Sequence, residues 1–105
     1  MEKLPIKFKE KWIAALRSGE YKQGKFTMYD SITQTYCCLG VAEIVAGNNI
    51  ETIGKTYSPR RLNRKSKVPE LLKSTTSSIS DILMGMNDSK DKTFNEIADW
   101  IEENL

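Results

Sequence analysis

The 105-residue sequence contains no histidine. Histidine is the usual general base near neutral pH and the commonest metal ligand. Its absence excludes Ser–His and Cys–His nucleophile pairs and every metal site that depends on imidazole. Enzymes that use carboxylates, lysine, tyrosine or an unassisted cysteine stay open, but they are a minority among small domains. We therefore expect a protein that is not an enzyme and that has no metal or cofactor.

The sequence also lacks a long apolar run. No stretch approaches the ~20 residues that span a bilayer, and the N-terminal stretch MEKLPIKFKEKW has no apolar signal-peptide core. We therefore expect a cytosolic protein with reduced cysteines and no membrane contact. No internal repeat or long linker divides the chain, so residues 1–105 are expected to form a single domain.

The net charge is small, but the charged residues are unevenly distributed. The formal net charge is +2, yet residues 55–67 contain six cationic residues and no acid. Residues 81–105 contain seven acids and two lysines. These two regions are expected to carry opposite electrostatic potentials.

Two long segments have helical periodicity. In residues 6–17 the apolar positions recur at helical spacing, with Pro5 before the first turn and Gly19 after the last. Near the C-terminus, Thr93 and Glu96 have the spacing of a capping box, and an apolar stripe follows from Phe94 to Leu105. A further apolar stripe at Ile79, Ile82, Leu83 and Met86 predicts a helix that ends at the polar stretch NDSKDK.

The central part of the chain has a different period. Aromatic and β-branched residues predict a β-hairpin that pairs about 24–30 with 34–38. The apolar run at 39–46 predicts a short buried helix that ends at the Gly–Asn–Asn of residues 47–49. Within residues 48–68, the stretch IETIGKTY could form another short strand, and Ser58–Pro59 indicates a helix start. Pro69, just after this segment, indicates a second helix start.

The predicted fold class is therefore α+β, with an N-terminal helix, a hairpin, a buried central helix and a C-terminal helical pair. Nine side chains are expected to share one core: Phe8, Trp12, Leu16, Leu39, Val45, Leu83, Phe94, Ile97 and Ile101.

Adjacent cysteines, Cys37 and Cys38, are the most conspicuous chemical feature. A disulfide between neighbours would be strained, because their α-carbons lie ~3.8 Å apart and disulfides prefer about 5.5 Å. A zinc site needs about four ligands, and the cysteine spacing is wrong for one. Cys38 at a helix N-terminus could be a reactive thiol and support a small cysteine-dependent enzyme. The favoured interpretation is that both cysteines pack as small apolar residues in the core.

Two segments are candidate binding sites. The turn after the first helix has two glycines and several hydrogen-bonding side chains, which are Arg17, Ser18, Tyr21 and Gln23. The basic segment forms a candidate anion or nucleic-acid patch, with Tyr57 available to stack on a base. Its members are Lys55, Tyr57, Arg60, Arg61, Arg64, Lys65 and Lys67. Each segment also has a structural alternative. The turn could be a helix cap with a connecting turn, and the basic segment could be a solvated loop.

The loop NDSKDKT resembles a calcium loop only superficially. Lys90 occupies the third position from Asp88, and the glycine in the middle of such loops is missing. We interpret it as a polar turn.

Three stretches, WIAALRSGEYKQGK, YCCLGVAEIVAG and LMGMNDSKDKTFNEIADWIEENL, resemble in order a widespread family of small, mostly uncharacterised proteins of tailed bacteriophages and prophages. The first motif falls on Trp12, Ala15, Leu16, Arg17, Ser18, Gly19, Tyr21 and Gln23. The second falls on Cys37, Cys38, Leu39, Gly40 and Val41. The third falls on Asn87, Asp88, Phe94, Ile97, Ala98, Asp99, Ile101 and Glu102. Members often have another cysteine after the second motif, where this chain reads AEIVAG.

The resemblance implies a phage accessory protein that acts in the bacterial host cytoplasm. Such proteins block or redirect a host protein, including anti-phage defence systems, or sequester a signalling nucleotide. We therefore expect a binding partner that is a host protein or a small nucleotide, with the turn at 17–23 as the favoured surface. A nucleic-acid-binding module that uses residues 55–67 is the first alternative, and a cysteine enzyme is the second.

Overall fold

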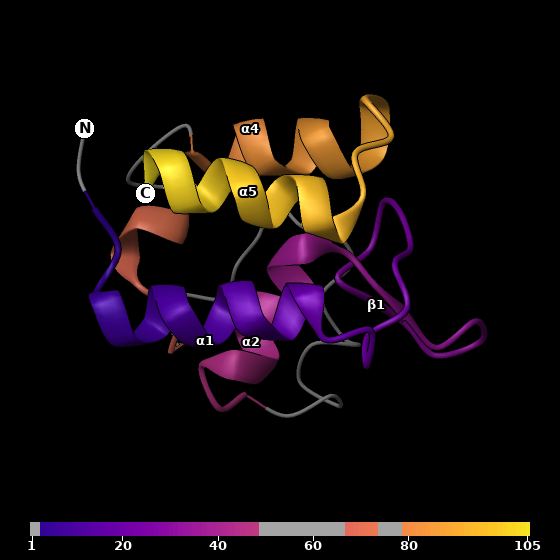
Figure 1. Ribbon diagram of the computed structural model, residues 1–105. Helices are drawn as coiled ribbons and strands as arrows, with labels where there is room; N and C mark the ends of the chain where they lie inside the picture. Colours follow the sequence, from indigo (N-terminus) through magenta and orange to yellow (C-terminus); the bar gives the residue numbers. More distant parts are fainter. Residues whose placement is uncertain (1–2, 49–66, 74–78) are drawn as a thin grey trace.

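A computed structural model of the chain describes residues 3–48, 67–73 and 79–105. Figure 1 shows helices packed around one core, with a small hairpin that extends away from them. The elements in chain order are α1 (Ile6–Arg17), β1 (Tyr29–Asp30), β2 (Thr35–Tyr36), α2 (Cys38–Val45), the 3-10 helix η1 (Glu70–Leu72), α4 (Ile79–Met84), the π-helix η2 (Gly85–Ser89) and α5 (Phe94–Asn104). Helices and an antiparallel hairpin in one small domain confirm the predicted α+β class.

The N-terminal and C-terminal helices form the principal packing contact. α1 lies beside α5, and α2 packs on α1 and on α4 (Figure 1). The backbone N–H of Leu4 donates to the carbonyl of Leu105 at 3.0 Å, which joins the segment before α1 to the end of α5. The fold therefore depends on contacts between segments that are far apart in the sequence.

Trp12 lies at the centre of these contacts. Its side chain is fully buried, and its indole N–H donates to the carbonyl oxygen of Cys38 at 3.0 Å, which links α1 to α2. Seven of the nine predicted core residues are buried, namely Trp12, Leu16, Leu39, Leu83, Phe94, Ile97 and Ile101. Phe8 and Val45 are only partly buried and pack against the edge of the core.

The predicted hairpin exists, but its strands are shorter than expected. β1 and β2 pair antiparallel with Tyr29 opposite Tyr36 and Asp30 opposite Thr35. Phe26 and Gln34 have positive φ angles of 70° and 56°, so the backbone leaves the extended conformation at both predicted strands. The predicted pairing of 24–30 with 34–38 was therefore wrong in its extent.

The helical segment that begins at Ile79 continues for three residues into the polar stretch NDSKDK, at which the sequence predicts its end. α4 leads directly into η2, which ends at Ser89. The reason is that Asn87, a polar residue in sequence, is fully buried and hydrogen-bonded. Ile82 was also assigned wrongly to the apolar stripe, since its side chain is 42% exposed and Met84 is buried.

The end of α1 and the start of α5 have the caps that the sequence predicted. Gly19 follows the end of α1 with a φ of 78°, the left-handed conformation that favours glycine. Thr93 caps α5, and Glu96 completes the predicted capping box. Among the described helices, none has the length and apolar character that a membrane span requires. The short strand considered for IETIGKTY and the expected helix start at Ser58–Pro59 lie outside the described residues, whereas Pro69 precedes η1.

Replacement of Trp12 by alanine is expected to cost about 3–5 kcal/mol of unfolding free energy, because a large cavity would form in a small core. Trp12→Phe removes the hydrogen bond to Cys38 but leaves a smaller cavity than alanine does, so it should cost less. Urea titrations of the three proteins would measure the difference. A Trp12→Ala variant as stable as the parent would contradict this placement.

Candidate functional site

The turn after α1 is closed by its own side chains. The Ser18 hydroxyl donates to the carbonyl of Ala15 at 2.7 Å and accepts from the N–H of Glu20 at 3.2 Å. Ser18 therefore satisfies backbone groups at the helix end, as caps do. This corresponds to the structural alternative for the turn that the sequence left open.

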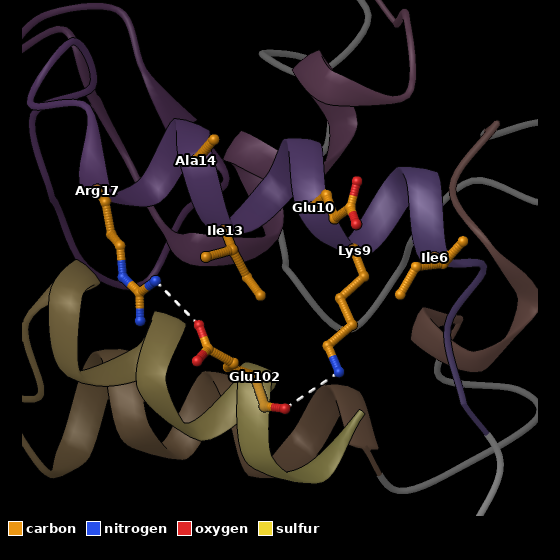
Figure 2. Close-up of a pocket in the computed structure, with 7 residues that line it drawn as sticks. All are labelled: Ile6, Lys9, Glu10, Ile13, Ala14, Arg17 and Glu102. Atoms are coloured by element: carbon orange, nitrogen blue, oxygen red, sulfur yellow. Dashed lines mark hydrogen bonds and ion pairs between the residues drawn. The ribbon is translucent and has the colours of Figure 1, made fainter.

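Arg17 joins the turn to α5. Its guanidinium donates to Asp99 at 2.5 Å and to Glu102 at 3.0 Å. The hydrogen bond to Asp99 is the largest cause that raises the pKa of Arg17, and the hydrogen bond to Glu102 is the second largest. Figure 2 shows the Arg17 side chain extending from α1 toward Glu102. The planar donor that made Arg17 a candidate for ligand binding is engaged here with two carboxylates of the same chain.

A groove of about 430 Å³ runs between α1 and α5. Ile13 lies between the two helices, Ile6 and Ala14 lie along α1, and Lys9 donates to the carbonyl of Glu102 at 3.1 Å (Figure 2). Contacts from Arg17 and Lys9 to Glu102 thus cross the groove. The groove is apolar at its base and crossed by charged contacts.

Gln23 is also held by the fold. Its amide nitrogen donates to Asn87 Oδ1 at 3.0 Å and to the Lys92 carbonyl at 2.8 Å, and its amide oxygen accepts from the N–H of Phe94 at 3.0 Å. Both ends of the side chain are used to attach the loop after α1 to the start of α5. Gln23 therefore positions two segments rather than presenting a free amide.

Asn87 is the buried partner in this network and was assigned by sequence only to a polar turn. Its side chain is fully buried and donates to the Gly24 carbonyl and to Asp88 Oδ1, both at 2.8 Å. Its oxygen accepts from Gln23 and from the backbone N–H of Cys38 at 3.3 Å. The Asn–Asp pair in the family resemblance was the only sequence signal that singled out this residue.

A second hollow, of about 200 Å³, lies beside this network. It is lined by Gln23, Lys25, Asn87, Asp91, Lys92 and Thr93. An ion pair joins Lys25 to Asp91, and Thr93 caps α5. The polar groups around this hollow are thus largely paired with one another.

Tyr21 belongs to an aromatic cluster on the hairpin. Its ring meets Tyr36 edge-on at 5.2 Å between centroids, and Tyr29 lies 4.8 Å from Tyr36 on the other side. Burial is the main cause that raises the pKa of Tyr36, and the neighbouring Tyr29 and Tyr21 raise it further. All three rings are partly buried, so Tyr21 supports the hairpin and also presents part of its ring to solvent.

The two cysteines are buried, as the core interpretation predicted. Cys37 and Cys38 are 1% and 0% exposed. Burial raises the pKa of the Cys37 thiol to about 12 and raises the pKa of Cys38 as well. A Cβ on Gly40 would lie 1.9 Å from the Met28 carbonyl, so glycine is required for α2 to approach the hairpin this closely. The cysteine motif thus has a packing role.

Two of the exposed large apolar side chains lie in a segment where the sequence did not predict a site. Ile32 is 92% exposed and Phe26 is 66% exposed, and both lie in the segment between α1 and α2. The residue pattern placed Phe26 in a strand, where its side chain would have packed on one face. Its backbone instead has a positive φ of 70°, which residue type alone does not reveal.

Of the candidate basic patch, only Lys67 lies within the described residues, and it is exposed. Lys55, Tyr57, Arg60, Arg61, Arg64 and Lys65 lie outside them. Within residues 3–48, 67–73 and 79–105, no three cysteine or carboxylate side chains come together in a way that could hold a metal ion.

Residues 4–53 match the model of a family described as a domain of unknown function, DUF8296. The matched stretch contains α1, the hairpin and α2. No curated protein and no solved structure matches the chain. The similarity is therefore to a family without an assigned activity.

Replacement of Asn87 by alanine is expected to cost about 2–4 kcal/mol, because the Gly24 carbonyl, the Cys38 N–H and the Gln23 amide would lose a buried partner. Ser80→Ala is the matched control. The Ser80 hydroxyl is buried without a hydrogen-bond partner among the described residues, so its removal should leave stability unchanged or slightly higher. Equal losses in the two variants would contradict the role of Asn87.

Burial of the cysteines predicts slow labelling by a thiol reagent in the native protein and rapid labelling in urea. Because the Cys37 pKa rises from about 8.5 in the unfolded chain to about 12 when folded, the unfolded state loses its proton first. Because of the thiols, the free energy of unfolding should therefore fall as pH rises above about 8.5. Replacement of both cysteines by alanine should reduce this alkaline loss. Rapid labelling of both native thiols would contradict their burial.

Proposed function

We propose that the protein is a non-enzymatic accessory protein of phage or prophage origin that binds a host protein and inhibits it. The observation that carries this proposal is the exposure of Phe26 and Ile32 on one short segment. The phage context comes from the sequence resemblance, and the bacterial cytosol is the corresponding location.

Exposed large apolar residues are few in the described part of the chain. Four side chains fall in this class, namely Ile6, Phe26, Ile32 and Ile82. Two of the four, Phe26 and Ile32, are separated by only five residues and flank the partly buried Tyr29. Exposed large apolar side chains are typical of protein interfaces, where a few such residues supply most of the binding energy.

Groups that could support catalysis have other roles in this fold. The cysteines are buried with raised thiol pKa values, and Gln23 is engaged at both ends of its side chain. Arg17 is paired with two carboxylates. Together with the missing histidine, these contacts favour binding over chemistry as the function.

The test is a pull-down of the full-length tagged protein from bacterial lysate, followed by mass spectrometry of proteins and co-eluting small molecules. Ile32→Asp should reduce the recovery of a specific protein at least tenfold, because a charge would replace an apolar contact. Ile82→Asp is the control, since Ile82 is also exposed but lies on α4. Equal effects of the two variants would contradict the proposed surface.

Two further variants address the sequence-based alternatives. Tyr21→Ala tests the turn that the sequence favoured, and a combined reversal of Arg60, Arg61 and Arg64 to glutamate tests the basic segment. If only the triple reversal abolishes capture, or if nucleic acid is recovered in a salt-dependent manner, the nucleic-acid alternative replaces the protein-binding proposal.

A further inference from the structure

The groove between α1 and α5 has an apolar wall that is open to solvent. Ile6, Ile13 and Ala14 line its α1 side, and Ile6 is 64% exposed. Figure 2 shows these side chains together with Glu102, which lines the groove from α5. A large exposed apolar side chain beside an apolar groove is typical of a surface that binds another protein.

The two helices that form the groove carry opposite charge. α1 contains four cationic residues and one acid, a formal charge of +3, and α5 contains four acids and no base, a formal charge of −4. The charged residues are Lys7, Lys9, Glu10, Lys11 and Arg17 on α1 and Glu96, Asp99, Glu102 and Glu103 on α5. A basic helix and an acidic helix therefore lie side by side (Figure 1).

Contacts within the chain use only part of this charge. Arg17 pairs with Asp99 and Glu102. The lysines that flank the two helices also contact α5, namely Lys3 at the Asn104 carbonyl and Lys92 at the Glu96 carboxylate. Four exposed charged side chains of the two helices have no hydrogen bond or ion pair among the described residues, namely Lys7, Glu10, Lys11 and Glu103. These charges are available to a partner.

The available lysines and two acids of α5 form stripes beside the groove. Lys7, Lys11 and Ala14 are spaced by four and three residues, so they share one face of α1, and Ala14 lines the groove. Asp99 and Glu103 are spaced by four residues and share one face of α5. All four charged side chains are exposed. A basic stripe (Lys7, Lys11) and an acidic stripe (Asp99, Glu103) therefore flank the groove.

The two stripes are in register with each other. The Leu4 N–H donates to the Leu105 carbonyl, and the Lys9 side chain donates to the Glu102 carbonyl, so α1 and α5 run antiparallel with their ends aligned. This register places two oppositely charged pairs at equal levels along the helices, namely Lys7 with Glu103 and Lys11 with Asp99.

We propose that this face binds a second copy of the chain and that the two molecules form a symmetric dimer. A two-fold axis parallel to the helices places α1 of each copy over α5 of the other and keeps equal levels together. Lys7 then meets Glu103 of the second copy, Lys11 meets Asp99 of the second copy, and the two apolar walls cover each other. The inference does not depend on the proposed function, because Phe26 and Ile32 do not line this groove.

A second copy fits this face better than a ligand of one charge. Phosphate groups of nucleic acid or of an anionic membrane would be attracted to α1 but repelled by the acids of the adjacent α5. A complementary surface must carry both signs in the opposite order, which the same face supplies when it is rotated about the two-fold axis. Glu10 is the one charge on α1 that opposes this arrangement.

Sedimentation equilibrium of the full chain tests the dimer. Exposed ion pairs are weak and are screened by salt, so the dissociation constant should rise about tenfold between about 0.05 M and about 0.5 M NaCl. A parent chain that stays monomeric at high concentration in the low-salt buffer would overturn the proposal.

Two single variants test the charge pairing. Lys7→Glu and Glu103→Lys each place like charges at both symmetric contacts, so each should raise the dissociation constant about tenfold. Neither change threatens its own helix, because an acid suits the first turn of α1 and a base suits the last turn of α5. Lys90→Glu and Asp81→Lys are the matched controls, since they make the same charge changes at exposed positions outside both helices. Controls that weaken the dimer equally would overturn the pairing.

An equimolar mixture of Lys7→Glu and Glu103→Lys is the decisive sample. In a mixed dimer both contacts join opposite charges again, so its dissociation constant should be close to that of the parent. Neither chain alone contains both changes, so a contact within one chain does not explain such a recovery. A mixture that dimerises no better than the separate variants would overturn the proposed arrangement.

The apolar wall and the opposing charge give two further variants. Ile6→Ser should weaken the dimer severalfold, whereas Ile82→Ser, at an exposed isoleucine of α4, should not. Glu10→Gln should strengthen the dimer, because it removes the charge that faces α5 of the second copy. If the parent is a monomer and Lys7→Glu instead abolishes capture of a different protein from bacterial lysate, that protein and not a second copy occupies the groove, and the proposal is overturned.

Discussion

The buried side chain of Asn87 is the contact on which the arrangement of the other segments depends. One amide bonds to the loop after α1, to the first residue of α2 and, through Gln23, to the start of α5. Buried polar groups must be satisfied, so each of these segments is fixed at the position where its hydrogen bond can form. The π-helix η2 is the local geometry that directs Asn87 and Asp88 toward the same loop.

The packing of α2 buries both thiols, whereas the Phe26 ring is exposed. The approach of α2 to the hairpin requires Gly40 and buries both cysteines, which raises their thiol pKa values. The segment around Phe26 lies at the surface, where the Phe26 N–H donates a hydrogen bond to Asp88. The buried thiols and the exposed Phe26 ring are the observations behind the proposal that the protein acts by binding.

In the turn at residues 17–23, side chains that the sequence singled out as hydrogen-bond donors have partners within the same chain. Arg17, Ser18 and Gln23 all make specific hydrogen bonds, as their residue types suggested, but those bonds are made to α1, α5 and Asn87. Only Tyr21 among the four also lies in the aromatic cluster beside the exposed apolar segment. Sequence spacing identifies donors, whereas the location of their acceptors is a tertiary property.

The sequence by itself determined the helices at both ends, the capping box at Thr93, the buried central helix and most of the core, because apolar periodicity and caps are local signals. It also favoured burial of the cysteines, since their spacing suited neither a disulfide nor a metal site, and the structure decided against an exposed thiol at Cys38. Only the tertiary structure decided the burial of Asn87, the continuation of α4 into η2 and the exposure of Phe26. The side chains of Asn87 and Asp88 bond to the backbone of Gly24 and Phe26, more than sixty positions away, and no local pattern encodes such a pairing.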